Sequence, residues 1–435
     1  MIVALLFALL FLLIALGMPI ALSIGVPAIG LILTPGVFPA TVPFAALGQT
    51  IIQLLFAGVD SFDLLAVPLF MLAGAIMESG GISRQIIDFS DSLVGWMPGG
   101  LAIVALAACA LFTAFTGASG VTIVALGALL VPALQKAGYK ESFNLGLVTT
   151  SGSLGLLFAP SLPLILYGVV AQQMALETPV SIDDLFLAGL LPGLLMLFAL
   201  SLYSAWQSRG IHKETRPFDK AEAWAAIKDS AWEIPLPFVV LGGIYSGFFA
   251  VSEAAALTAF YVLIVSVFIR REIGFTQLPQ VMRDSMKLVG AILLILAVSM
   301  ASTNYMIDAG VPEQIFGFIQ QHVSDAFTFL LLLTIFLLIL GMMLDIFSAI
   351  VIMIPIILPI AVEYGIHPIH LGILFLANMQ LGYFTPPVGM NLFIASFRFN
   401  KPVMTLYRAT IPFFFILLAC VLIITYWPGL SLVLL

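Results

Sequence analysis

Long apolar runs interrupted by glycine and proline constrain this sequence more than any other feature. The first run, at residues 2–16, is separated from the next by Gly17-Met18-Pro19, and similar runs continue to the last residues. A helix needs about 20 apolar residues to cross a bilayer, and several of these runs are shorter. Because 62% of the residues are apolar and only 9% are charged, the chain lacks the charge that a soluble surface requires. We therefore expect an all-α polytopic membrane protein and not a soluble enzyme.

The runs predict the positions of the helices, and the net charge of −7 argues against nucleic acid as a partner. Amphipathic segments are expected at 82–95 and 311–322, an interfacial stretch at 43–58, and one long polar stretch at 207–233. We expect helices at 2–16, 19–34, 61–79, 100–117, 120–135, 141–153, 161–176, 185–206, 234–247, 252–269, 284–307, 326–343, 346–362, 368–382, 386–397 and 411–432.

The few charged residues predict the orientation in the membrane. Basic residues gather in 207–233 and at Arg270-Arg271, so these segments are expected in the cytoplasm. The acidic loop that holds Asp183 and Asp184 has no basic residue and is expected outside, as is 308–325. These assignments agree only if 100–135 forms a hairpin entered from the cytoplasm and 326–362 one entered from outside. Both termini are then external.

The two halves of the chain match each other at an offset of 226 or 227 residues. VPALQKAGYKESFNLG (131–146) aligns with LPIAVEYGIHPIHLG (358–372), and FAPSLPL (158–164) aligns with FTPPVGM (384–390). Since the predicted topology gives the halves opposite orientations, we expect two inverted repeats, each with a re-entrant helical hairpin and a broken helix. This arrangement is typical of secondary transporters, whose sites lie where helices are interrupted.

The polar residues at the two hairpin tips and the two breaks are the candidate binding residues. Small residues let the backbone bend, and hydroxyls with freed carbonyls supply the oxygen ligands that Na⁺ prefers. Asp345 is a rare acid in an apolar hairpin. We expect a first Na⁺ site at Gly117, Ser119, Ser151, Gly152, Ser153 and Leu156, a second at Asp345, Ser348, Gly382, Thr385 and Pro386, and substrate at Thr116, Ser119, Pro160, Ser161, Asn378, Pro387 and Asn391.

Other interpretations of these residues remain open. The small residues also permit close helix packing, Asp345 also suits the cap of the following helix, and Glu253 suits the start of one. Gly117-Ala118-Ser119-Gly120 matches the G-x-S-G pattern of intramembrane serine proteases, but the histidines lie in predicted loops, so no base is at hand. An uncoupled channel-like subunit is the other alternative, although no filter or charged ring is evident. We expect no enzymatic activity, and we expect Cys109 and Cys420 to be isolated buried thiols.

Four segments carry a family resemblance. FTGASGVTIVALGALLVPALQKAGY, SGSLGLLFAPSLPLILYGVV, GIYSGFFAVSEAAAL and LGYFTPPVGMNLFIAS resemble the large membrane subunit of tripartite ATP-independent periplasmic (TRAP) transporters. The resemblance implies an ion-transporter-superfamily elevator fold and Na⁺-coupled uptake of organic acids across a bacterial inner membrane. It also implies a periplasmic substrate-binding protein and a small membrane subunit as partners. Because this chain begins at the large subunit, we expect the small subunit to be a separate polypeptide.

The resemblance, combined with the repeat, predicts which parts move. The transport domain is expected at 61–176 (arm 82–95, hairpin 100–135, broken helix 141–176) and 288–397 (arm 311–322, hairpin 326–362, broken helix 368–397). The scaffold is expected at 1–60, at 185–287 with the cytoplasmic linker 207–233, and at 403–435. By position, the family's Na⁺ sites fall on the two tips with their breaks, around Ser119 and Asp345, and substrate falls between the tips.

Overall fold

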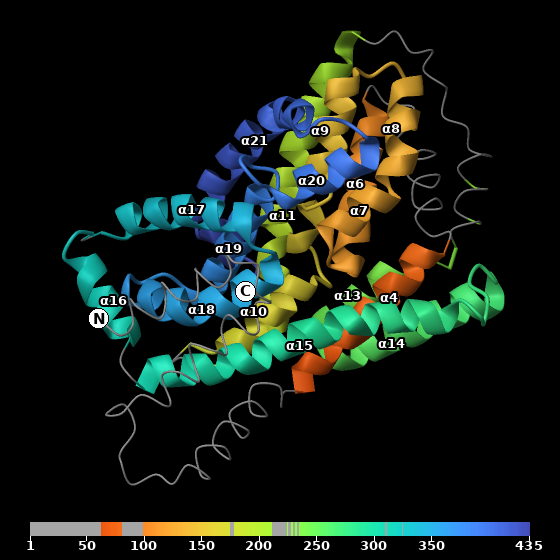
Figure 1. Ribbon diagram of the computed structural model, residues 1–435. Helices are drawn as coiled ribbons and strands as arrows, with labels where there is room; N and C mark the ends of the chain where they lie inside the picture. The colour runs from red at the N-terminus through yellow and green to blue at the C-terminus, as the bar shows by residue number, and fades with distance from the viewer. Residues whose placement is uncertain are drawn as a thin grey trace.

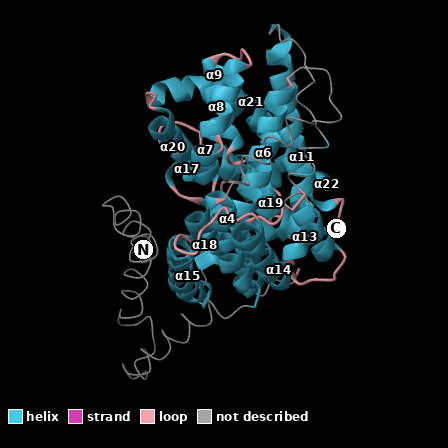
Figure 2. Ribbon diagram, turned by 90° about the vertical axis from the view of Figure 1, so that its right-hand side faces the viewer, coloured by secondary structure: helices cyan, strands magenta, loops and turns pink. Residues whose placement is uncertain are grey.

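The computed structural model describes residues 62–80, 99–174, 178–210, 224, 228, 231–232, 235–308, 311–323 and 325–435. The expected helices at 2–34, the stretch 43–58, the arm 82–95 and most of the linker 207–233 lie outside these residues. Every regular element in the described part is a helix, which confirms the all-α prediction (Figures 1 and 2).

The first half contains one hairpin and one broken helix. Helix α4 (Ala66–Ser79) follows a short 3-10 turn (Phe62–Leu65). The hairpin consists of α6 (Gly100–Thr116), α7 (Ser119–Ala125) and α8 (Gly127–Lys136). The broken helix consists of α9 (Glu141–Ser151), the turn η2 (Leu154–Leu157) and α10 (Leu162–Gln173), and the long helix α11 (Ile182–Gln207) follows. The returning arm of the hairpin was expected to be one straight helix, but α7 and α8 meet at a bend of 51°.

The second half repeats this order after three intervening helices, α13 (Pro235–Tyr245), α14 (Val251–Leu263) and α15 (Leu278–Asp308). Helix α14 continues through a π-helical segment (Ile264–Ile269). The arm α16 (Val311–Gln320) leads into the hairpin α17 (Ala326–Met343) and α18 (Ile346–Glu363). The broken helix α19 (Pro368–Gly382) and α20 (Met390–Phe399) is followed by α21 (Val403–Tyr426) and the short α22 (Gly429–Leu432).

Several helices are suited to a bilayer. Among the described residues, six helices, counting the broken Glu141–Gln173 as one, are long and apolar enough to cross a membrane. The bent pair α7 and α8 raises this to seven if it is counted as one span. The chain is therefore a multi-pass membrane protein by helix length and composition.

The internal repeat is visible in the backbone. The starts of α18 and α19 lie 227 residues after those of α7 and α9 (346 and 119, 368 and 141). Each break packs on the outgoing arm of its own hairpin: a Cβ on Gly155 would lie 2.2 Å from the carbonyl oxygen of Ala110, and one on Gly382 would lie 2.6 Å from the Cα of Gly341. In Figure 1 one hairpin runs toward the middle of the molecule from the upper right and the other from the left. Two inverted repeats thus form the fold.

Two groups of helices pack around the repeats. Helices α14 and α15 both lie against α4, on the lower right of Figure 1. Helices α11 and α21 instead contact the broken helices directly: a Cβ on Gly189 of α11 would lie 2.3 Å from the carbonyl oxygen of Leu157, and one on Gly146 would lie 2.3 Å from that of Ala409 in α21. The division of these helices into a scaffold and a moving unit stays a prediction.

Candidate functional site

The first hairpin tip contacts the second break. Gly117 ends α6 in a left-handed conformation with φ +66°, and this turn places Ser119 at the start of α7. Ser119 is buried, and its hydroxyl donates to the side-chain oxygen of Asn391 at 2.8 Å. The amide of Asn391 donates in turn to the carbonyl oxygen of Thr149 at 3.5 Å. The network joins residues from both repeats at one buried point.

A threonine clasp holds the two arms of the first hairpin to the first break. The hydroxyl of Thr113 donates to the carbonyl oxygen of Gly152 at 2.8 Å. Since a hydroxyl has a single hydrogen, Thr113 must accept at its 2.5 Å contact with Thr122. Both threonines have no exposed surface. The positions 227 residues later are Leu340 and Ala349, so only the first repeat has this clasp.

The hydroxyls of the first break bond mainly to its own backbone. Ser153 donates to the carbonyl oxygen of Thr150 at 3.1 Å and lies 3.4 Å from that of Gln380, its counterpart in the second repeat. Ser161 caps α10 and donates to the carbonyl oxygen of Leu156 at 2.5 Å. Ser153 and Leu156, both expected as Na⁺ ligands, therefore already have partners within the chain.

Side chains fill the start of α18 at the second tip. The carboxylate of Asp345 accepts from the backbone N–H of Phe347 at 3.1 Å and of Ser348 at 3.0 Å, and it also accepts from the hydroxyl of Ser348 at 2.5 Å. The N–H of Ile346 donates to the hydroxyl of Tyr383 at 2.6 Å. The helix N-terminus is thus occupied by the protein's own oxygens, and Asp345 has the capping role that was the alternative to ion binding.

The second break is closed by backbone contacts. The hydroxyl of Thr385 donates to the carbonyl oxygen of Leu381 at 2.8 Å, and the N–H of Gly389 donates to that of Met342 at the second tip at 3.2 Å. Pro386 and Pro387 are joined by a cis peptide bond, as are Ala159 and Pro160 in the first break. Tyr407 of α21 donates to the carbonyl oxygen of Pro387.

The predicted site residues divide into those that meet and those that do not. Ser119 meets Asn391, and Asp345 meets Ser348. By contrast, Asn378 lies about one turn before the end of α19, and its amide donates to the carbonyl oxygen of Leu374 in the same helix. The sequence analysis did not select Thr113, Thr122, Thr149 or Tyr383, whose only signal was a hydroxyl inside an apolar run.

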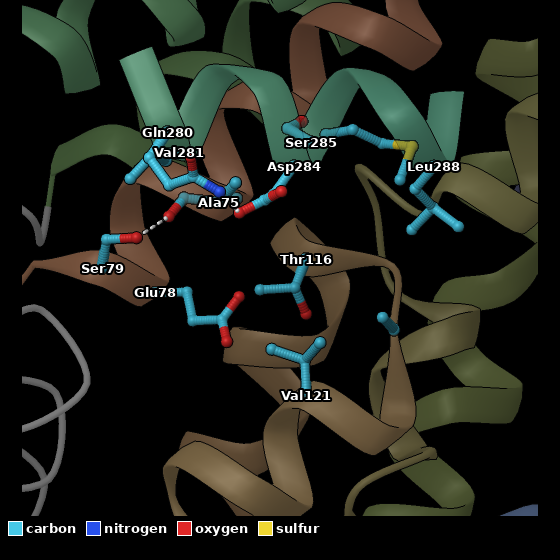
Figure 3. A pocket seen from close by; sticks show the side chains of 13 residues that line it. Ala75, Glu78, Ser79, Thr116, Val121, Gln280, Val281, Asp284, Ser285 and Leu288 are labelled. Atoms are coloured by element: carbon cyan, nitrogen blue, oxygen red, sulfur yellow. Dashed lines mark hydrogen bonds between the residues drawn. The ribbon is translucent and has the colours of Figure 1, made fainter. Parts of the chain in front are cut away.

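A cavity of about 410 Å³ adjoins the first tip (Figure 3). Thr116, Ala118 and Val121 line one side of it, and α4 and α15 line the other, with Glu78 and Asp284 at its edge. Thr116 itself donates to the carbonyl oxygen of Phe112 in its own helix at 3.0 Å. The cavity gives the first tip an opening between the hairpin and the helices α4 and α15.

The remaining polar candidates have structural roles. The carboxylate of Glu253 accepts from the N–H of Ala250 at 3.0 Å, which confirms its place at the start of a helix. Cys109 and Cys420 are buried free thiols, as expected. The Ser119 hydroxyl donates to an amide oxygen and not to a histidine, which is a different arrangement from that of a serine protease.

Comparisons with known proteins agree with one another. Residues 7–430 match the family model "Tripartite ATP-independent periplasmic transporter, DctM component". The chain is 34% identical to the C4-dicarboxylate TRAP transporter large permease protein DctM of Rhodobacter capsulatus, over 98% of this chain and 97% of that protein. It is 31% identical to the 2,3-diketo-L-gulonate TRAP transporter large permease protein YiaN of Escherichia coli, over 96% of this chain and 95% of that one.

Two further similarities concern a longer relative and a solved structure. The isethionate TRAP transporter permease protein DctMQ of Oleidesulfovibrio alaskensis is 35% identical over 95% of this chain, which spans only 63% of that protein's length. The crystal structure of the Alcanivorax borkumensis YdaH transporter superposes with a TM-score of 0.63, over 94% of this chain and 96% of that one. At 13% sequence identity, this second similarity concerns the fold alone.

Proposed function

The chain belongs to the DctM family of tripartite ATP-independent periplasmic transporters, and from this membership we propose that it is the large permease subunit of a Na⁺-coupled importer of small organic acid anions. Relatives are named for C4-dicarboxylates, isethionate and 2,3-diketo-L-gulonate, which are carboxylates or sulfonates. We propose the same chemical class for this chain.

The buried meeting of Ser119 with Asn391 is the observation that best supports this function. It brings the tip of one repeat onto the break of the other, and transporters with inverted repeats bind substrate at such interfaces. The hairpins and broken helices, at 100–135 and 288–397, contain no Lys or Arg that could neutralise an anion. An uncompensated anion at mid-membrane depth is costly, so bound Na⁺ is the proposed source of positive charge.

The driving force follows from the membrane potential. Each Na⁺ that enters across about 100 mV contributes roughly 2.3 kcal/mol, before its concentration gradient is added. Two ions therefore support an accumulation of about a thousandfold or more, at about 1.4 kcal/mol per tenfold. We propose that the transport domain moves as an elevator, with substrate held between the tips.

We also propose the setting of the complex. A periplasmic substrate-binding protein delivers the anion, and a small membrane subunit on a separate chain supports the scaffold. The complex lies in the bacterial inner membrane with both termini of this chain on the periplasmic side.

The test is uptake into proteoliposomes that contain all three components, with and without a Na⁺ gradient. Saturable uptake that requires Na⁺ is expected, and Ser119→Ala or Asp345→Ala should raise the Na⁺ concentration needed for half-maximal uptake. Uptake that ignores the Na⁺ gradient would reject the coupling, and uptake that also fails to saturate would favour the channel-like alternative. Wild-type Na⁺ curves in both variants would reject the ion-site assignment.

A further inference from the structure

A chain of three hydrogen bonds connects the two hairpin tips. At the second tip, the N–H of Ile346 donates to the hydroxyl of Tyr383 at 2.6 Å. The carbonyl oxygen of the same Tyr383 accepts from the N–H of Asn391 at 2.9 Å. The side chain of Asn391 accepts from the hydroxyl of Ser119, at the first tip, at 2.8 Å. Tyr383 and Asn391 are the only residues between Ile346 and Ser119 in this chain.

Tyr383 is held firmly enough to transmit a displacement. Its side chain is 2% exposed, and it caps the end of α19 directly after Gly382, which packs against α17. Tyr383 contacts one tip through its side chain and the start of α20 through its backbone. Because both groups belong to one closely packed residue, a shift of the second tip relative to its break must be accommodated at Asn391 or break a buried hydrogen bond.

The connection is not duplicated by the repeat. The residue 227 positions before Tyr383 is Leu156, which has no hydroxyl, and the residue that matches Asn391 is Leu164. The first tip therefore cannot be tied to the second by a symmetry-related chain of the same kind. A single polar connection runs between the tips.

We propose that Tyr383 is a positioning residue that couples the two tips, so that an ion bound at one tip favours the ion-binding geometry of the other. This inference rests on the proposed Na⁺ sites at the tips. Coupling between two sites is reciprocal and changes binding typically about 5- to 150-fold. The coupled protein should respond cooperatively to Na⁺, and cutting the chain of hydrogen bonds should make each tip respond alone.

Tyr383→Phe removes the bond to Ile346 and keeps the ring. Tyr167→Phe is the matched control, because Tyr167 is equally buried and its hydroxyl makes one backbone bond, to the carbonyl oxygen of Pro368 at 2.6 Å, away from both tips. A second variant, Asn391→Leu, cuts the chain at its other end with the residue that the first repeat has at this position.

The readout is maleimide labelling of the first tip in the reconstituted complex, without substrate, as Na⁺ is raised. The reporter is Ala118→Cys, which lines the cavity beside the tip, in a background in which the buried Cys109 and Cys420 are alanine. We expect cooperative protection in the reporter protein, with a Hill coefficient near two. Tyr383→Phe and Asn391→Leu should lower the coefficient toward one and raise the half-protecting Na⁺ concentration about tenfold.

The outcomes separate the coupling from the proposed function. Cooperative protection that Tyr383→Phe abolishes and Tyr167→Phe keeps would support the inference. Cooperative protection that survives in both Tyr383→Phe and Asn391→Leu would overturn it and leave the Na⁺ sites in place. An equal loss in Tyr167→Phe would also overturn it, because any buried hydroxyl would then have the same effect. Labelling that Na⁺ does not change in the reporter protein would reject the proposed Na⁺ coupling itself.

Discussion

The threonine clasp of the first hairpin allows a sharp test of how the first tip is organised. Thr113→Val replaces the hydroxyl by a methyl group of similar size, so the packing of the buried site is kept. The carbonyl oxygen of Gly152 then loses a donor at 2.8 Å, and Thr122 loses its acceptor at 2.5 Å. Thr122 has a weaker substitute, the carbonyl oxygen of Ala118 at 3.4 Å, so only part of the loss is recovered.

The size of the effect follows from these bonds. A buried group left without its partner costs about 1–3 kcal/mol, whereas hydrogen bonds inside membrane proteins average roughly 0.6 kcal/mol, with a maximum of about 1.7 kcal/mol. We expect a loss of about 1–2 kcal/mol, which corresponds to about 5- to 30-fold in an equilibrium constant. If the clasp holds the first tip in its ion-binding geometry, this loss raises the Na⁺ concentration for half-maximal uptake and leaves the maximal rate at saturating Na⁺ nearly unchanged.

The assay is a Na⁺ titration of uptake in proteoliposomes with the complete transporter. Thr113→Ser should restore the wild-type curve, because it returns the hydroxyl. Thr150→Val is the control: Thr150 is as buried as Thr113, but its hydroxyl bonds only within its own helix, to the carbonyl oxygens of Gly146 at 2.8 Å and Leu147 at 3.2 Å. A Thr113→Val curve that equals the wild type, or that shifts no more than Thr150→Val, would refute the role of the clasp.

Two further predictions concern stability. Gly155→Ala should destabilise the purified protein by about 1–3 kcal/mol in denaturant titrations, because its Cβ would lie 2.2 Å from the carbonyl oxygen of Ala110, whereas Gly290→Ala, with nothing within 4 Å, should be neutral or slightly stabilising. A similar response of the two glycines would contradict the packing of this break. Hydrogen bonds from the backbone and hydroxyl of Thr328 hold the pKa of Asp325 below its ordinary value of 3.8. The cap of α17 should therefore contribute fully above pH 3.8 and be lost as the pH falls below it, and Asp325→Asn should weaken this pH dependence of the melting temperature.

The sequence predicts the helices well where glycine, proline or charge bounds an apolar run. The hairpin arms expected at 326–343 and 346–362 match α17 and α18 to within one residue. The start of α21 was missed by eight residues, because its first turns carry polar side chains such as Thr405 and Arg408 and the apolar run begins only at 411. The start of α20 was placed at 386, but the helix begins at 390, after the two prolines and Gly389, whose φ is +58°.

The candidate site was only partly predictable, for a physical reason. The tips and breaks were found because small and polar residues are conspicuous in apolar runs. Their partners were not, because Ser119 and Asn391 are 272 residues apart and nothing local indicates that they meet. Thr113 and Tyr383 each look like an ordinary helix residue until the neighbouring segment shows what the hydroxyl bonds to.

The asymmetry between the repeats explains why single substitutions should address the tips separately. The repeat supplies nearly the same backbone twice, but the first tip is fastened by Thr113 and the second by Tyr383, and neither residue has a polar counterpart in the other repeat. Asp345, which caps the second tip, corresponds to Ala118 in the first. Loss of one fastening therefore cannot be compensated by the matching residue of the other repeat. If Na⁺ binds at both tips, Thr113→Val should shift the half-saturating Na⁺ concentration and keep cooperativity, whereas Tyr383→Phe should remove cooperativity. A common effect of both variants would mean that the tips act as one site.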